Sequence, residues 1–126
     1  MKGNNMKQYK INKAYPALMR LADFRLPINK ARKLYDITNC LAEHFKFALS
    51  EERKYIEDCN GTSNDDGTVS FPSPEYFGQY QEKMIELNEL EIDINIDPVI
   101  LTESEIGNQT ISISDIRNLE GFVSFE

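Results

Sequence analysis

Cys40 and His44 are the two residues of this sequence whose types and spacing best suit nucleophilic catalysis. A thiol beside an imidazole can be activated, and side chains four residues apart on a helix are neighbours. His44 is the only histidine, however, and a helix surface lacks the donors that an oxyanion requires. We therefore expect both residues to be structural. The competing enzyme hypothesis requires a Cys40 thiol with a depressed pKa.

Neighbouring carboxylates could serve acid–base or metal chemistry. They occur as Glu51 and Glu52, Glu89 and Glu91, and Glu103 and Glu105. Each group lies in a strongly polar context without a histidine ligand, so we interpret all three as solvated surface. We expect no catalytic residue, no metal and no cofactor.

A polar segment places oxygen-bearing side chains at alternate positions, as a calcium-binding loop does. Its members are Asn60, Thr62, Asn64, Asp66 and Gly67. Counted from Thr62, the twelfth position is Ser73, where such a loop needs a bidentate Glu, so ordinary turn chemistry is favoured. The sequence also lacks the glycine-rich phosphate loops, the GxSxG elbow and the HExxH zinc motif.

Charge is distributed unevenly along the chain. Residues 1–60 carry 12 Lys and Arg against 7 Asp and Glu, whereas residues 61–126 carry 2 against 14. One interpretation is that the basic half packs beside the acidic half and is partly neutralised. The other is that the acidic half presents a negative surface to a basic partner. A basic stripe with interleaved aromatic residues is missing, so we do not expect nucleic-acid binding.

Two long helices are predicted to position these groups. The first follows Pro27 and ends before Gly61, with apolar residues at alternating three- and four-residue steps. The second begins at Pro74, with Ser73 as its N-cap, and continues to about residue 90. We expect them to form an antiparallel hairpin over residues 28–90, with the second helix lying against residues 34–56.

The two ends of the chain are predicted to hold smaller elements. Residues 1–10 are interpreted as a flexible arm, and a short helix is expected over Pro16–Asp23. Alternation predicts strands over residues 90–97 and 109–114, and Thr102 with Glu105 suggests a capping box. Ser114 is expected to cap a last helical turn that ends at Gly121.

The sequence therefore predicts an α+β protein with a long antiparallel helical hairpin, a short N-terminal helix and a small C-terminal antiparallel β element. Residues 11–126 are expected to form one domain, with a β and turn region over residues 91–126. No segment has the apolar length of a membrane span, and the opening residues lack the apolar centre of a signal peptide. We expect no membrane association and a cytoplasmic location.

The segments Leu26–Asp58 and Phe77–Val123, joined through a DDG turn, resemble small proteins of tailed bacteriophages and prophages. The shared pattern is a long charged helix ending in an EER-type segment, a second helix running into an acidic strand of the form ELEIDI, and a terminal DIRNLEGF segment. The resemblance covers most of residues 11–125 and implies a phage origin, with the cytoplasm of a bacterial host as the location. It carries no catalytic residue.

Two hypotheses follow, and in both the protein acts by binding other proteins. The first is a phage-encoded protein that binds a host protein, as an inhibitor of bacterial defence would, through acidic residues of its C-terminal half. The residues expected at that surface are Glu89, Glu91, Asp93, Asp97, Glu103 and Glu105. The second is a virion or tail-assembly component or chaperone that binds phage structural proteins or associates with copies of itself.

Overall fold

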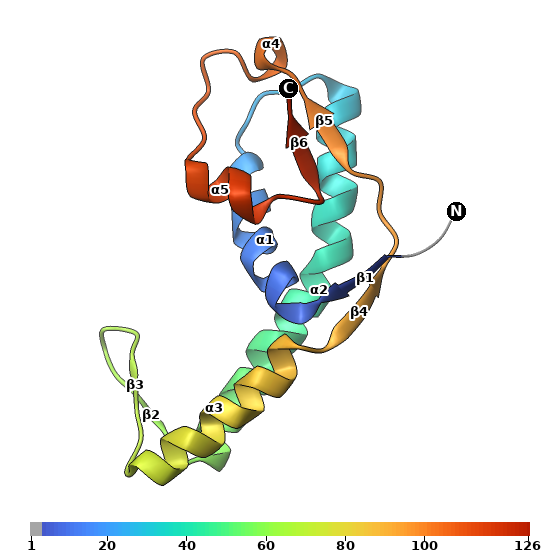
Figure 1. Cartoon of the computed structure of the whole chain (residues 1–126). Helices are drawn as coiled ribbons and strands as arrows, with labels where there is room; N and C mark the ends of the chain where they lie inside the picture. Colours follow the sequence, from blue (N-terminus) through green and yellow to red (C-terminus); the bar gives the residue numbers. More distant parts are fainter. Residues whose placement is uncertain (1–3) are drawn as a thin grey trace.

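Helix α2 (Ile28–Asp58) is the central element of the fold, and other helices pack on both of its halves. The computed structural model describes residues 4–126 (Figure 1). At 1.5 Å per residue the 31 residues of α2 span roughly 46 Å, as the uninterrupted sequence between Pro27 and Gly61 predicts. The α+β class and the long helix are confirmed.

Helix α1 (Gln8–Leu21) packs antiparallel to the first half of α2 and is longer than the predicted Pro16–Asp23 segment. Its buried stripe of Ile11, Ala14, Leu18 and Leu21 begins well before Pro16. Pro16 lies inside the helix, where packing of this stripe offsets the backbone hydrogen bond that proline cannot make. Tyr15 also stacks on Phe45 of α2, with ring centroids 4.6 Å apart.

Strand β1 (Asn4–Lys7) and the first residues of α1 stand where a flexible arm was predicted for residues 1–10, of which residues 1–3 lie outside the described part. It pairs antiparallel with β4 (Glu91–Ile94), Met6 facing Ile92 and Lys7 facing Glu91. The pairing continues into α1, because the Gln8 backbone N–H donates to the Leu90 carbonyl at 2.8 Å. The polar N-terminal sequence gives no strand signal. It is ordered by the open edge of β4.

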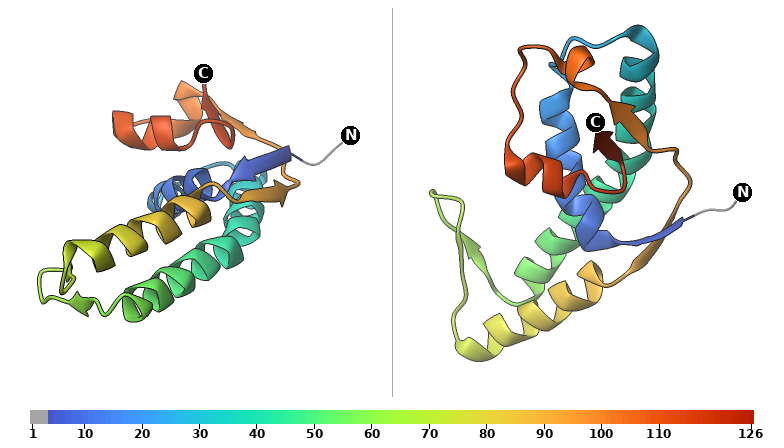
Figure 2. Two further views of the ribbon diagram at one scale, coloured as in Figure 1. Left: turned by 60° about the horizontal axis from the view of Figure 1, so that its bottom comes forward. Right: turned by 45° about the horizontal axis from the view of Figure 1, so that its top comes forward.

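Helix α3 (Pro74–Asn88) packs along the second half of α2 only, as Figure 2 shows. Ser73 caps it as predicted, accepting from the Tyr76 N–H. A small hairpin of β2 (Thr62–Ser63) and β3 (Val69–Ser70) joins the two helices. The predicted helical hairpin therefore exists, but its contact begins near the middle of α2, because α1 covers the first half.

The C-terminal segment folds over α1 and α2 as β5 (Val99–Leu101), α4 (Glu103–Ile106), α5 (Ile113–Asn118) and β6 (Val123–Phe125). The expected antiparallel element is wrong here, because α4 and α5 form a crossover that brings β6 back parallel to β5. The capping box of Thr102 and Glu105 is present.

The strand predicted over residues 109–114 is absent from the described structure, and the cap predicted at Ser114 is two residues late. Ser112 instead accepts from the Asp115 N–H and caps α5. Docking of α5 on α1 decides between these alternatives, because it places Asp115 against Arg20.

The hydrophobic core lies between α1, the first half of α2, and the C-terminal segment. Its fully buried members include Ile11, Leu41, Leu101, Leu119 and Phe122. Among residues 4–126, no helix combines the length and apolar character that crossing a membrane requires. The second half of α2 and α3 extend away from this core.

Candidate functional site: an acidic helical arm

An arm formed by residues 46–89 projects from the rest of the molecule (Figures 1 and 2). It contains the second half of α2, the β2–β3 hairpin and α3, and we call it the acidic arm. The remaining described residues, 4–45 and 90–126, form the body. Ala48, Cys59 and Leu87 are the arm's buried apolar residues, so a thin interface holds the two helices together.

Most of the protein's net negative charge lies on this arm. Residues 46–89 carry 10 Asp and Glu against 4 Lys and Arg, a net charge of −6. In the body, residues 4–45 have a net charge of +5 and residues 90–126 a net charge of −7, so the body as a whole is close to neutral at −2. The formal charge of −7 for the whole chain, which includes Lys2, is thus concentrated in about a third of its residues.

Ion pairs connect oppositely charged segments within the body. Arg20 donates two hydrogen bonds to Asp115, from Nε at 2.8 Å and from Nη2 at 2.6 Å. Lys30 pairs with Glu105 at 3.3 Å. These contacts join the basic N-terminal segment to the acidic C-terminal segment, as the neutralising interpretation predicts.

The arm's carboxylates are mostly exposed. The exposed acidic residues of the arm are Glu57, Asp58, Asp65, Asp66, Glu75, Glu82, Glu86 and Glu89. Within residues 4–126, Glu89 alone of these eight forms an ion pair, with Lys7 at 2.5 Å. Glu82, Glu86 and the C-cap residue Glu89 follow one another at steps of four and three, so they lie along one face of α3 and its C-terminal end. The arm therefore presents an ordered row of negative charge.

Aromatic packing fixes the arm's two helices. Phe71, which follows β3, packs against Tyr80 of α3 with ring centroids 4.9 Å apart and against Phe77 at 5.6 Å. The Tyr80 hydroxyl donates to Glu52 of α2 at 2.9 Å. Burial, followed by this bond to Glu52, raises the pKa of Tyr80 to about 12. A neutral Tyr80 therefore links α3 to α2 at physiological pH.

The hairpin at the arm's tip is held by polar side chains from the segment that suggested a calcium loop. Asp66 accepts from the Thr68 hydroxyl at 2.6 Å and from its N–H at 3.0 Å, and these bonds lower the pKa of Asp66. Asn64 donates to the hydroxyls of Thr68 and Ser70. The described residues include no group of three or more His, Cys, Asp or Glu side chains placed to hold a metal ion.

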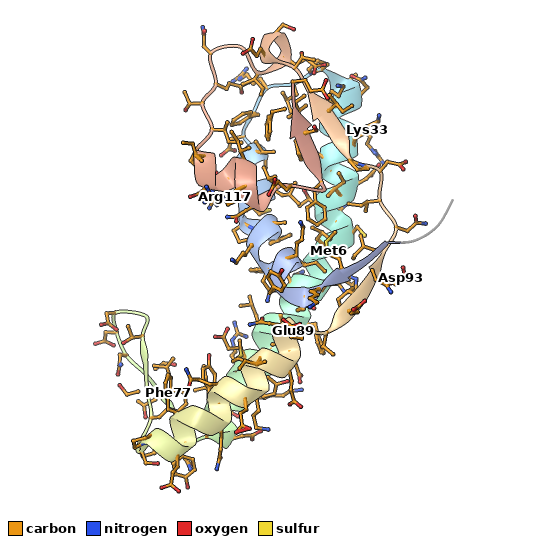
Figure 3. The ribbon with its side chains drawn as sticks, in the orientation of Figure 1. Met6, Lys33, Phe77, Glu89, Asp93 and Arg117 are labelled. Atoms are coloured by element: carbon orange, nitrogen blue, oxygen red, sulfur yellow. The ribbon has the colours of Figure 1, made fainter. Side chains whose placement is uncertain are left out.

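The six residues predicted to bind a partner do not form one surface. Glu89 pairs with Lys7, and Glu105 pairs with Lys30 inside its capping box. Glu91, Asp93 and Asp97 are exposed on and after β4, where Figure 3 shows Asp93. Glu103 is exposed on α4, at the other end of the α1–α2 pair (Figure 1).

The arm residues Glu75, Glu82 and Glu86 were missed by the sequence prediction. Counting charge in two halves divided at residue 60 assigns the acidic end of α2 and α3 to different halves, although the two helices lie side by side. A window over residues 46–89 would have shown the net charge of −6.

Cys40 and His44, the candidates for nucleophilic catalysis, both lie on α2. The Cys40 thiol is half-buried against the core, and burial raises its pKa. The enzyme hypothesis needed the opposite direction. No hydrogen bond joins the two side chains in the described part of the chain, and the His44 carbonyl accepts from Gln8 Nε2 at 3.0 Å.

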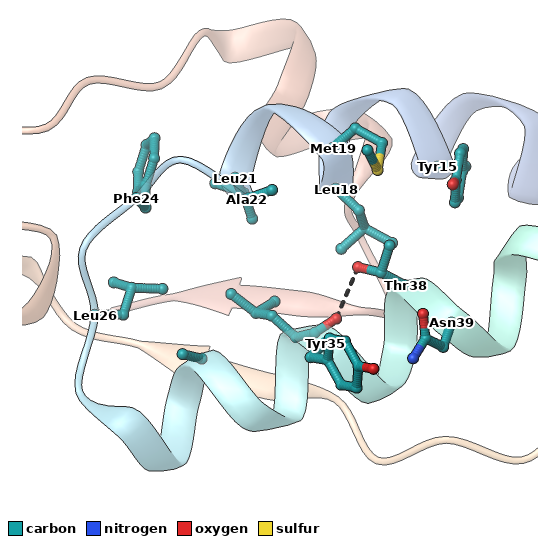
Figure 4. A pocket seen from close by; sticks show the side chains of 12 residues that line it. Tyr15, Leu18, Met19, Leu21, Ala22, Phe24, Leu26, Tyr35, Thr38 and Asn39 are labelled. Carbon is teal, nitrogen blue, oxygen red and sulfur yellow. Dashed lines mark hydrogen bonds between the residues drawn. The ribbon is translucent and has the colours of Figure 1, made fainter.

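An apolar groove of about 440 Å³ opens between α1 and α2 (Figure 4). Leu18 and Met19 of α1 and Tyr35 of α2 approach it, and no charged residue lines it. The nearby Thr38 hydroxyl is bonded to the Leu34 carbonyl at 2.7 Å. The groove offers apolar contact area without a charged side chain.

Comparisons of this chain with protein-family models, curated proteins and solved structures give no match. The resemblance to phage proteins stays a prediction, and the acidic arm is the candidate site because of its own charge and exposure.

Proposed function

We propose that this chain is a non-catalytic phage protein that binds a basic surface of a host protein through its acidic arm. Inhibition of a bacterial defence protein is the role that suits the proposal best. The observation that carries it is the net charge of −6 on a projecting arm beside a nearly neutral body.

Exposed carboxylates on a projecting arm favour association with a cation-rich partner. Their summed field steers an oppositely charged protein toward the arm and raises the association rate. Charges attached to two packed helices keep their spacing, so a partner with matching cations loses little entropy in ordering them. An isolated pair of exposed charges would contribute little, whereas a row of them adds both attraction and orientation.

An apolar side chain within the charged row supplies a contact of a second kind. Ile85 is 62% exposed, and its neighbours at three residues before and four residues after are Glu82 and Glu89. Interfaces commonly combine an apolar anchor with a polar rim. Ile85 is the anchor in this proposal, and the carboxylates around it are the rim.

The test compares two triple variants that change the net charge equally. The arm variant is Glu75→Gln with Glu82→Gln and Glu86→Gln, and the body variant is Glu91→Gln with Asp93→Asn and Asp97→Asn. A partner is first identified from host lysate with the tagged protein, and its Kd is then measured by calorimetry at low and physiological salt. We expect the arm variant to bind roughly tenfold more weakly and the body variant to bind within about twofold of the wild type.

The control also tests the surface predicted from the sequence. A larger loss from the body variant would move the interface to β4 and the segment that follows it. Equal affinity at both salt concentrations would contradict an electrostatic interface. Light scattering of the same sample distinguishes host binding from the assembly hypothesis. A stable oligomer that captures only phage structural proteins would favour assembly over host binding.

A further inference from the structure

A small pocket between α1 and α5 collects positive charge on this otherwise acidic protein. Its volume is about 150 Å³, and its lining consists of Tyr9, Lys10, Lys13, Arg117 and Asn118. The lining therefore holds three cations and no carboxylate. Figure 3 shows Arg117 on α5, beside α1.

The fold brings these residues together from distant parts of the sequence. Lys10 and Lys13 are three residues apart on α1 and share a face of that helix. Arg117 and Asn118 end α5, which packs across α1 next to the bidentate contact of Arg20 with Asp115.

Two sets of distances locate the lysine side chains. A Cβ added at Gly121 would lie 3.7 Å from Cε and 3.8 Å from Nζ of Lys10, so this lysine lies along the turn after α5. Lys13 Nζ lies 5.9 Å from the ring centroid of Tyr9, at the outer limit of a cation–π contact. Both lysines thus lie beside the pocket that they line.

None of the three cations forms an ion pair within residues 4–126. The ion pairs within residues 4–126 use Lys7, Arg20, Lys30, Arg32 and Lys54. Glu120 follows Arg117 by three residues but does not line the pocket. Tyr9 and Lys13 also border a hollow that contains Glu89, whose carboxylate is bonded to Lys7.

We propose that this pocket binds a phosphate group. Three converging like charges repel one another, and a dianion between them would replace repulsion by attraction. The guanidinium of Arg117 offers paired donors, the lysines act as point charges, and the Asn118 amide and the Tyr9 hydroxyl can donate further hydrogen bonds. Inorganic phosphate and the phosphate of a larger ester share this chemistry.

The experiment is a titration followed by amide chemical shifts of the isotope-labelled full chain. Inorganic phosphate is one titrant, adenosine 5′-monophosphate is the second, and sodium chloride at equal ionic strength is the control. We expect saturable shifts at residues 9–13 and 117–121 with both phosphates, and no such shifts with chloride. Tighter binding of the ester assigns the pocket to a phosphorylated molecule, whereas equal binding assigns it to the free ion.

Variants of equal charge make the result specific. Lys10→Gln with Arg117→Gln should weaken phosphate binding roughly tenfold or more, because two charge-assisted contacts are lost. Arg25→Gln with Lys33→Gln changes exposed cations elsewhere and should leave binding unchanged. Phosphate shifts identical to those with chloride, or equal losses in both variants, would overturn the proposal. The arm variant described above should bind phosphate normally, so the two proposals fail independently.

Discussion

Gly61, at the end of the turn that follows α2, provides a direct test of the arm's packing. The residue that needs the left-handed backbone here is Asn60, with φ of 59°, so Gly61 is required by space. A Cβ at Gly61 would lie 2.8 Å from Ile56 Cγ2, 2.9 Å from Phe71 Cε1 and 3.1 Å from the Ile56 carbonyl oxygen. Carbon atoms pack best at about 3.5–4.0 Å, so Gly61→Ala must displace Phe71 or the last turn of α2.

The expected cost follows from this overpacking. Insertion of one methyl group into a filled site costs about 1–3 kcal/mol, and displacement of Phe71 would also disturb its contacts with Phe77 and Tyr80. Gly78→Ala is the matched control. A Cβ at that helical position meets no atom within 4 Å beyond the neighbouring backbone of its own helix, so alanine should stabilise α3 by about 0.5–1 kcal/mol.

Urea unfolding of the wild type and both variants measures the difference. With a slope of about 1–3 kcal/mol per molar urea, the two alanine variants should differ in midpoint by roughly 1 M, on opposite sides of the wild type. Hydrogen exchange should show the loss in Gly61→Ala first at α3 and the hairpin. A midpoint for Gly61→Ala equal to that of the wild type would refute the close packing of the arm's tip.

Three further predictions concern titratable side chains. The Arg20 guanidinium lowers the pKa of Asp115, so the ion pair stabilises the fold above the ordinary carboxyl pKa, and this stabilisation is lost as the pH falls through the lowered pKa. Asp115→Asn should therefore cost about 1–2 kcal/mol in thermal unfolding at neutral pH and progressively less in acid. A loss of stability that does not depend on pH would contradict the ion pair. The pKa of Tyr80 is raised to about 12, so its neutral form stabilises the fold below about pH 10, and this contribution disappears toward pH 12. Tyr80→Phe should remove one tyrosine that ionises at high pH from an ultraviolet titration of the protein. An unchanged titration would count against the hydrogen bond to Glu52. Burial raises the pKa of the Cys40 thiol, so iodoacetamide should modify Cys40 more slowly than it modifies a free thiol at neutral pH. Faster modification of Cys40 would support the enzyme hypothesis.

Local signals in the sequence were sufficient for the long helices. Pro27 and the Ser73–Pro74 pair mark helix starts by chemistry that acts within a few residues, and the structure begins α2 and α3 there. The capping box of Thr102 and Glu105 was predicted for the same reason.

Elements fixed by distant partners could not be predicted in this way. Strand β1 forms because β4 offers an unpaired edge almost ninety residues later in the chain. The parallel pairing of β5 with β6 depends on the path of α4 and α5 between them. The limits of the acidic arm likewise follow from the packing of α3 against the second half of α2, which joins acidic segments from both sides of residue 60.

The arm is also a continuous segment of the chain that leaves the body and returns to it. The polypeptide leaves the body along α2 and returns at Leu90, whose carbonyl is bonded to Gln8 at the start of α1. Strands β1 and β4 pair at the base of the arm, and the core of the body lies outside the arm. The packing of the body therefore depends little on the far end of the arm. Removal of seven residues from each helix, about two turns, would preserve the facing sides of α2 and α3. The reach of the charged surface can thus vary in steps of about 10 Å on an unchanged scaffold.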